Sequence, residues 1–439
     1  MSDTTAHAQT AEAEVADICR DLIRIDTSNY GDGSGPGERK AAEHIGTLFD
    51  EVGLDTTIYE SEPGRASIFT RLEGTDPSAP ALVVHGHTDV VPADKSEWSV
   101  DPFSAEDRDG LIWGRGAVDM KDMDAMIVAN VREMIRNGIK PRRDIIIGFF
   151  ADEEAGGVQG ARWCIQNHPE LFDGATEAIS EVGGYSVDLR GRRTYLVQTA
   201  EKGIAWIKLI AKGSAGHGSQ INDDNPVTRL AGAVARIGAH QWPKRLTPAV
   251  RELLEGVADI TGLTFNADNT DELLAELGSV AKFVGATLQN TSNPTALHAG
   301  YKHNVIPGTA EALIDIRTLP GDDKHVLDTV RELAGDGVDL QMMVEDVALE
   351  TEFSGSLVDT MTSSLLAEDP SARVLPYNLS GGTDNKSLSK LGITGYGFAP
   401  LQLTSDLDFP AMFHGVDERV PTSALEFGTR VLRRFMVDA

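Results

Sequence analysis

The first half of the chain alternates short apolar runs with stretches of helical periodicity. The apolar runs are SIFTRL, ALVVHGH, DIIIGFF and AISEV, and the helical stretches include Val15–Ile25 and MKDMDAMIVANVREMIRNG. Strands that alternate with helices favour an α/β sheet that is at least partly parallel. In such a sheet the working site lies beyond the carboxyl ends of the strands. The polar residues that follow the apolar runs are therefore the first candidates for chemistry.

The pattern changes near Glu201 and returns to its earlier form towards the C-terminus. The middle segment holds the alternating strands KGIAWIKLIAKG, NVIPGTAEALIDIRTLPG and VDLQMMVEDVALE, with helical patterns between them. The buried-strand pattern GITGYGFAPL and the helix SALEFGTRVLRRFMV come later. We therefore expect a discontinuous first domain over residues 1–201 and 354–439, with a second α/β unit, residues 202–353, inserted into it.

Composition narrows the class of protein. The 439 residues carry a formal net charge of -29, from 68 acidic and 39 basic side chains, and this charge would repel a phosphate backbone. We expect no nucleic-acid partner. No apolar run approaches the roughly twenty residues that span a bilayer, and the acidic N-terminus lacks a secretory pattern, so we expect no membrane partner and a cytoplasmic location. Cys19 and Cys164 lie in helical stretches and are expected to be buried free thiols.

The segment ALVVHGHTDVVP places His87 and Asp89 at the end of an apolar run, two residues apart and on one side of extended chain. A carboxylate that holds one imidazole nitrogen fixes the tautomer in which the other nitrogen binds a metal. His87 is therefore a candidate ligand and Asp89 a residue that orients it. On this segment alone, a strand-end turn with a hydrogen-bonded histidine is an equally good interpretation.

Two further segments supply carboxylates. Asp119, in GRGAVDMKDMDAMIVAN, stands at the entrance to a predicted helix, where an aspartate is commonly a cap, although one carboxylate can also bridge two cations. Glu153 and Glu154, in DIIIGFFADEEAGG, follow the most apolar strand. Neighbouring side chains of extended chain point in opposite directions, so one glutamate can bind metal while the other faces an attacking water. An acidic surface pair is the usual meaning of such a doublet.

The last two candidates lie further along the chain. Glu181, in ATEAISEVGG, also ends an apolar run, and His414 lies in FHGVDERVP. Either residue alone would be incidental. Together the candidates supply two histidines and several carboxylates, a ligand field that suits Zn²⁺ and also Co²⁺ or Mn²⁺.

The motifs HGHTDVVP, GRGAVDMK, ADEEAGG, SEVGG and FHGVDERV occur in this order over almost the whole chain. With them the chain resembles the di-zinc metallopeptidase family, family twenty of clan MH, that includes acetylornithine deacetylase, succinyl-diaminopimelate desuccinylase, aminoacylase, carnosinase and glutamate carboxypeptidase. The resemblance implies a zinc-peptidase-type, three-layer catalytic domain with a mixed sheet. It also implies an inserted α+β lid domain through which two subunits form a homodimer.

The resemblance assigns roles to the candidate residues. One metal ion would be bound by His87 and Glu181, the other by Glu154 and His414, and Asp119 would bridge the two. Glu153 would be the general base that takes a proton from the attacking water and hands it to the leaving amine. Asp89 would orient His87.

The resemblance extends to the lid and the pocket. GSAGHGS is similar to a family motif whose histidine, here His217, reaches the partner subunit's site and stabilises the oxyanion. Asn304 and Arg317 would contact the substrate, and GGTDNK, with Thr383 and Lys386, would line the pocket. The chain departs from the family pattern in MKD for MKG, in the valine after Glu181, and in Lys386, which stands where many relatives have arginine. A lysine does not reproduce the arginine fork.

These observations predict an enzyme. The expected activity is hydrolysis of a small-molecule amide, a dipeptide or an N-acyl amino acid, with two divalent metal ions, foremost zinc, and release of an amino acid. One alternative is a biosynthetic deacylase of the succinyl-diaminopimelate desuccinylase or acetylornithine deacetylase type. An alternative of another class is a non-catalytic metal-binding protein, which the intact set of ligands and base disfavours.

Overall fold

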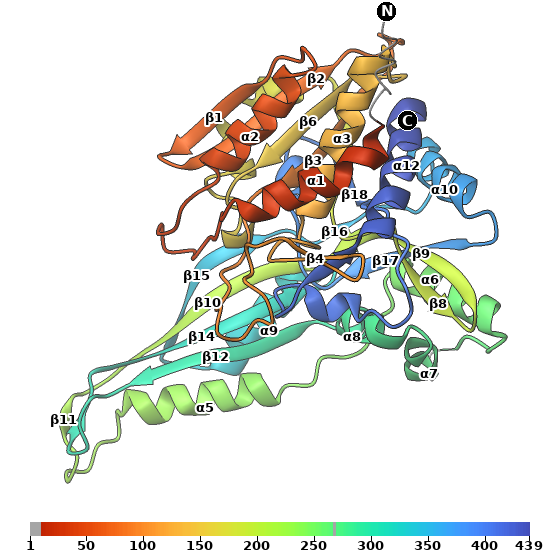
Figure 1. The fold of residues 1–439 in the computed structure, drawn as a ribbon. Helices are drawn as coiled ribbons and strands as arrows, with labels where there is room; N and C mark the ends of the chain where they lie inside the picture. The colour runs from red at the N-terminus through yellow and green to blue at the C-terminus, as the bar shows by residue number, and fades with distance from the viewer. Residues whose placement is uncertain (1–9, 267–268) are drawn as a thin grey trace, which may run out of the picture.

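The computed structural model describes residues 10–266 and 269–439. These residues form a body around a larger sheet and an arm around a smaller sheet that projects from the body (Figure 1). The mixed α/β fold class that the sequence predicts is confirmed.

The larger sheet is mixed. Strand β3 runs parallel to β6 and β7, β18 runs parallel to β7, and the outer pairs such as β1–β2 and β8–β9 are antiparallel. The strands in spatial order are β1 (Thr57–Glu62), β2 (Arg65–Leu72), β6 (Ile145–Phe150), β3 (Ala81–His87), β7 (Ala175–Ser180), β18 (Thr394–Gly397), β9 (Arg192–Glu201) and β16 (Leu349–Glu350), with β17 (Arg373–Leu379) and β8 (Tyr185–Leu189) also paired to β9.

Helices cover both faces of this sheet, which gives three layers (Figure 1). Alternate side chains of a strand point to opposite faces, and in β6 Ile145 and Ile147 enter one apolar core while Ile146 and Phe150 enter the other. The first core is built with α1 (Ala11–Arg24), α2 (Arg39–Asp50), α3 (Lys121–Asn137), α10 (Ser356–Glu368) and α12 (Thr422–Asp438). The second is built with α4 (Ala161–Asn167) and α11 (Asn385–Ser389). A strand that is buried on both faces shows no alternation of apolar and polar residues. For this reason β3 and β6 appear in the sequence as continuous apolar runs.

The smaller sheet is antiparallel. Its strands are β12 (Thr291–Ala299), β14 (Thr309–Thr318), β10 (Gly203–Lys212) and β15 (Val338–Asp346), and α5 (Pro226–Ala239) and α9 (Asp323–Ala334) pack on one face. In β10, Ala205, Ile207 and Leu209 are buried towards the helices while Trp206 points outward and is 41% exposed. At the far end of the arm, β11 (Gly216–His217) pairs with β13 (Val305–Ile306) (Figure 1).

Most of the segment between α5 and β12 packs on the body, although Trp242 near its start belongs to the core of the arm. The segment contains α6 (Pro248–Thr261), α7 (Thr270–Ala275) and α8 (Ala281–Gly285), and the apolar side chains of α6, such as Val250 and Leu254, belong to the core of the larger sheet. The expected boundaries around residues 202–353 remain a prediction. Within that range, the strands of the arm belong to the core of the smaller sheet, whereas α6 belongs to the core of the larger sheet, where it packs on β17.

The remaining elements are short. Strands β4 (Glu106–Arg108), β5 (Leu111–Trp113) and β19 (Arg419–Pro421) form a small sheet, and the 3₁₀ turns are η1 (Glu153–Ala155), η2 (Pro169–Phe172), η3 (Gly278–Val280), η4 (Ala286–Leu288) and η5 (Phe409–Met412). Cys19 and Cys164 are buried free thiols, as predicted. None of the helices in the described part of the chain is long and apolar enough to cross a membrane.

Candidate active site and metal centre

The carboxyl ends of three neighbouring parallel strands bring most of the candidate residues together. His87 ends β3, Glu153 and Glu154 follow β6, and Glu181 follows β7. Because parallel strands end at the same edge of a sheet, their following residues meet there. Asp119 precedes α3 and His414 follows η5, and both loops reach the same edge.

The candidate ligands form two adjoining groups. His87, Glu153 and Glu181 offer ligand atoms within 4.8 Å of one another, as do Asp119, Glu154 and His414. Asp119 lies between the groups: its Oδ1 is 3.2 Å from His87 Nε2, and its Oδ2 is 3.2 Å from His414 Nε2. A carboxylate that presents one oxygen to each of two histidines has the arrangement that a bridging ligand of two cations needs.

The other carboxylates complete each group. Glu181 Oε2 lies 3.6 Å from His87 Nε2, and Glu154 Oε2 lies 3.0 Å from His414 Nε2. His87 is 1% exposed, and its Nε2 accepts or donates no hydrogen bond among the described residues. A buried imidazole nitrogen that faces only carboxylates is suited to a cation, and the combined nitrogen and oxygen donors suit zinc and its first-row neighbours.

Asp89 holds the other side of the His87 ring. His87 Nδ1 lies 3.1 Å from the backbone oxygen of Asp89 and 3.4 Å from its carboxylate Oδ1. The same carboxylate accepts hydrogen bonds from the backbone N–H groups of Glu153 and Glu154, each at 3.1 Å. Asp89 therefore connects the end of β3 to the turn that carries both glutamates.

The prediction that Glu153 and Glu154 lie on extended chain is wrong. Residues Glu153–Ala155 form the 3₁₀ turn η1 rather than extended chain, and Asp152 before it is left-handed, with φ +65°. The turn still directs the two side chains differently. Glu153 Oε2 lies 4.0 Å from His87 Nε2, whereas Glu154 contacts His414.

The cluster gathers several buried carboxylates with few positive charges near them, and this shifts the pKa values of its members. Burial, followed by the neighbouring carboxylates, raises the pKa of Glu153 well above its usual range. Burial also raises the pKa of Glu181 to about 7. The contacts of His414 with Asp119 and Glu154 raise its pKa to about 10. Bound cations would relieve this accumulation of negative charge.

Glu418 is a residue of the site that the sequence analysis missed. Its Oε1 accepts the N–H groups of Val118 and Asp119 at 2.7 and 3.2 Å, and its Oε2 accepts Arg115 Nη1 and the N–H of Gly116 at 2.8 and 3.0 Å. It therefore fixes the loop that presents Asp119. Glu418 lies four residues after His414 in the motif FHGVDERV. Its position in that motif was the signal that could have identified it.

We expect Glu418→Gln to lower the free energy of unfolding by about 3 kcal/mol, because it breaks a buried pair and turns an amide N–H₂ towards donors. Glu418 is 0% exposed, so water does not replace the lost contacts. Urea denaturation of the metal-free protein measures the change. Glu332→Gln on the exposed face of α9 is the matched control. A loss of stability no larger than that of the control would show that Glu418 does not hold this loop.

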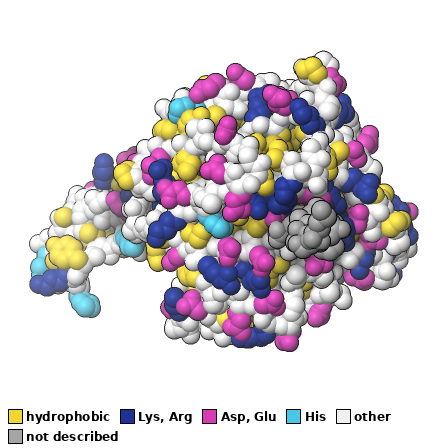
Figure 2. All heavy atoms as spheres, turned by 45° about the horizontal axis from the view of Figure 1, so that its top comes forward, with side chains coloured by type: hydrophobic (Ala, Val, Ile, Leu, Met, Phe, Trp, Pro, Cys, Tyr) yellow, Lys and Arg dark blue, Asp and Glu magenta, His cyan; other side chains and the backbone are white. Residues whose placement is uncertain are grey.

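The residues expected from the lid lie elsewhere. His217 and Asn304 lie together at the tip of the arm, where Gly218 N donates to Asn304 O at 2.9 Å. Figure 1 shows this tip, marked by β11, at the end of the arm remote from the body. In the space-filling view the arm projects clear of the body and carries histidine side chains near its end (Figure 2). The structure does not bring His217 to the metal centre of its own chain.

The expected pocket residues are engaged with protein groups. Arg317, on β14, binds Asp315 with Nε to Oδ1 at 2.7 Å and Nη2 to Oδ2 at 3.1 Å. The hydroxyl of Thr383 donates to Glu201 Oε1 at 2.6 Å. Lys386 is 1% exposed, and its Nζ donates to the backbone oxygen of Lys202. Their contacts with a substrate stay a prediction.

Comparisons with known proteins identify the family of the chain. The family profile described as Peptidase family M20/M25/M40 matches residues 83–438. The N-fatty-acyl-amino acid synthase/hydrolase PM20D1 of Xenopus tropicalis is 26% identical over 452 residues, covering 96% of this chain and 85% of that protein. Aminoacylase-1 of Homo sapiens is 27% identical over 399 residues, covering 88% and 86%. The M20 family metallo-carboxypeptidase Sso-CP2 of Sulfolobus solfataricus has a similar fold, with a TM-score of 0.74 at 18% identity, covering 96% of this chain and 98% of that one.

Proposed function

The chain belongs to Peptidase family M20/M25/M40 and is a hydrolase, and on this premise we propose that it uses two divalent metal ions to release an amino acid from an N-acyl amino acid or a dipeptide. The observation that carries the proposal is Asp119, whose two oxygens each lie 3.2 Å from a different histidine. The aminoacylase and N-fatty-acyl-amino acid hydrolase relatives support the substrate class.

The residues divide the work of the reaction. Two bound cations would polarise the amide carbonyl and make the attacking water more acidic. Of the carboxylates near His87, Glu153 lies farther from Nε2 than Glu181, at 4.0 against 3.6 Å, and its side chain is more exposed, at 15% against 7%. We assign to Glu153 the removal of the water proton and its delivery to the leaving amine. Asp89 keeps His87 in one orientation throughout.

Zinc is the proposed metal, because two histidines and several carboxylates suit it best among the common divalent ions. Cobalt and manganese are the alternatives that the same donors would accept. A cytoplasmic location and a homodimer formed through the arm complete the proposal.

Amide hydrolysis by the protein after removal of metal tests this function. The chelated protein is reconstituted with zinc, cobalt or manganese, its metal content is measured, and amino-acid release is followed from dipeptides, N-acetyl and N-succinyl amino acids. We expect release that depends on metal and reaches its maximum at two ions per chain. Release from N-succinyl substrates alone would support a biosynthetic deacylase. No release from protein that holds two ions would support the non-catalytic binding protein.

We propose that His217 acts in the active site of the partner subunit, because the tip of the arm lies away from the site of its own chain. His217→Ala should lower kcat by about 10²-fold if the imidazole donates to the oxyanion. Metal content should not change. Steady-state kinetics with elemental analysis measures both quantities.

Mixed dimers distinguish this role from a local one. A dimer of one His217→Ala subunit and one Glu153→Gln subunit contains one site in which both residues are intact. Random exchange between the two variants should therefore restore about a quarter of the wild-type activity. If verified mixed dimers stay as inactive as their parents, or if the active protein is a monomer, His217 does not act across the interface.

A further inference from the structure

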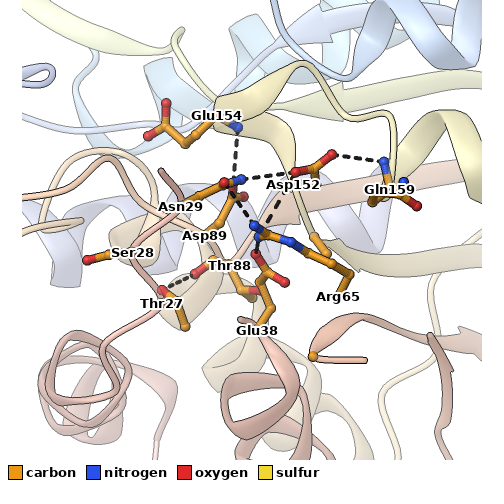
Figure 3. A network of polar contacts seen from close by, with 12 residues as sticks. Thr27, Ser28, Asn29, Glu38, Arg65, Thr88, Asp89, Asp152, Glu154 and Gln159 are labelled. Atoms are coloured by element: carbon orange, nitrogen blue, oxygen red, sulfur yellow. Dashed lines mark hydrogen bonds and ion pairs between the residues drawn. The ribbon is translucent and has the colours of Figure 1, made fainter. Parts of the chain in front are cut away.

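A buried polar network includes Asp89 (Figure 3). Asp89 faces His87 Nδ1, whereas the candidate metal ligands Asp119 and Glu181 face His87 Nε2. The central residue of the network is Asn29, in the loop between α1 and α2, which is 5% exposed. Around it lie Arg65 at the start of β2, Asp89 after β3 and Asp152 after β6. Asn29 therefore stands where three strands of the larger sheet end or begin.

The side chain of Asn29 uses its full hydrogen-bonding capacity. Its Nδ2 donates to Asp89 Oδ2 at 2.9 Å and to Asp152 Oδ1 at 3.1 Å. Its Oδ1 accepts Arg65 Nη2 at 2.9 Å and the N–H of Gly31 at 3.0 Å. The neighbours fix the orientation of the amide, because two carboxylates require the N–H₂ group and two donors require the oxygen.

The network reaches the metal centre through one carboxylate. Besides Asn29, Asp89 accepts the N–H groups of Glu153 and Glu154 and lies 3.4 Å from His87 Nδ1. Asp152, the other acceptor of Asn29, begins the same turn and also accepts the N–H of Gln159 at 2.8 Å. The amide of Asn29 thus ties Asp89 to the turn that carries the proposed base and one metal ligand.

The charges explain why an amide and an arginine occupy these places. Asp89 and Asp152 face the same Nδ2 group and would repel each other without a donor between them. Arg65 supplies positive charge nearby, with Nη1 4.0 Å from Asp152 Oδ1 and in contact with the buried Glu38. Arg65 thereby holds Asn29 in the orientation in which it donates to both aspartates.

We propose that Asn29 is a positioning residue of the active site, which, held by Arg65, sets the placement of Asp89 against the Glu153–Glu154 turn. All four hydrogen bonds of its side chain are made to protein groups. The inference rests on the proposed two-metal site, because its effect is the alignment of His87, Glu153 and Glu154. Residues that orient metal ligands in this way commonly change metal affinity or activity by 10–100-fold when they are altered.

Asn29→Asp tests the proposal, because it keeps the volume and the acceptor for Arg65 but turns an acceptor towards Asp89 and Asp152. The matched control is Asn130→Asp, which makes the same change at a 0% exposed asparagine that donates to Thr429 O at 3.0 Å from within α3. The dissociation constants of both zinc ions are measured by competition with a chelator. The visible absorption of the cobalt protein, kcat and KM are measured beside them.

We expect Asn29→Asp to weaken zinc binding by about 10–100-fold, to alter the cobalt spectrum and to lower kcat more than KM changes. Asn130→Asp should lose stability without these effects. Equal zinc affinities and cobalt spectra in the two variants would overturn the proposal. If Asn29→Asp does not fold, Arg65→Lys is the second test, because it keeps the charge but replaces the two nitrogens that contact Glu38 and Asn29 separately with one ammonium. Zinc affinity within about 3-fold of wild type would then overturn the proposal. Failure of the wild-type protein to bind two ions would instead count against the proposed function.

Discussion

Glu153→Gln is expected to lower kcat by about 10⁴-fold while the protein keeps both metal ions. Glutamine preserves the shape of the side chain but cannot accept the proton of the attacking water, and a positioned general base contributes up to this factor. Glu153 is the carboxylate near His87 that lies farthest from Nε2 and is the more exposed, as proton transfer with a substrate requires. Steady-state kinetics and elemental analysis of the purified variant measure the two quantities.

The metal content of Glu153→Gln distinguishes a base from a ligand, because Glu153 is placed with His87 and Glu181 in a group that could hold one metal ion. Loss of a metal ion from Glu153→Gln would make Glu153 a ligand and remove it from the role of base. Retained activity with two ions would refute the assignment as well. Glu332→Gln, on the exposed face of α9, controls for the loss of one negative charge.

Asp119→Asn is expected to reduce metal binding from two ions to one or fewer and to lower kcat/KM by at least about 10³-fold. The amide offers only one ligand oxygen, so its N–H₂ group must face either His87 or His414, each of which now lies 3.2 Å from an Asp119 oxygen. The lost polarisation of the carbonyl is worth several kcal/mol, and each 1.36 kcal/mol changes a rate about tenfold. Calorimetric titration with zinc gives the stoichiometry.

A variant with the same change elsewhere controls for the lost charge. Asp359→Asn, at the exposed first turn of α10, should bind two ions and keep its activity. If Asp119→Asn also bound two ions with unchanged affinity, Asp119 would not bridge them. A capping role would not explain Asp119 either, because the N-cap of α3 is Met120 and no side chain caps this helix.

The chain pattern predicted the elements that carry the site because the signals for them are local. Strands β3 and β6 are buried along their whole length, and such strands are visible as unbroken apolar runs wherever they lie in the fold. Strand β7 is buried only over its last three residues. The rule that sites form at the carboxyl ends of parallel strands then pointed to His87, Glu153 and Glu181. The ordered motifs identified the family, which the profile match confirms.

The local geometry at the strand ends could not be read in the same way. Extended chain was expected at Glu153 and Glu154, but the structure has a 3₁₀ turn there. Asp89, which follows β3, accepts the N–H groups of Glu153 and Glu154 in this turn. A contact between residues more than sixty positions apart leaves no periodic signal.

The sequence by itself determined the class of fold, the order of its elements and the types of residue that can hold two metal ions, because hydrophobic periodicity and ligand chemistry belong to short segments. The tertiary structure alone decided which residues meet. It set Asp119 between His87 and His414, Glu418 beneath the Asp119 loop, Asn29 between two aspartates, and His217 away from its own site. Such contacts join residues far apart in the chain, and only the packing of the strands and helices brings them together.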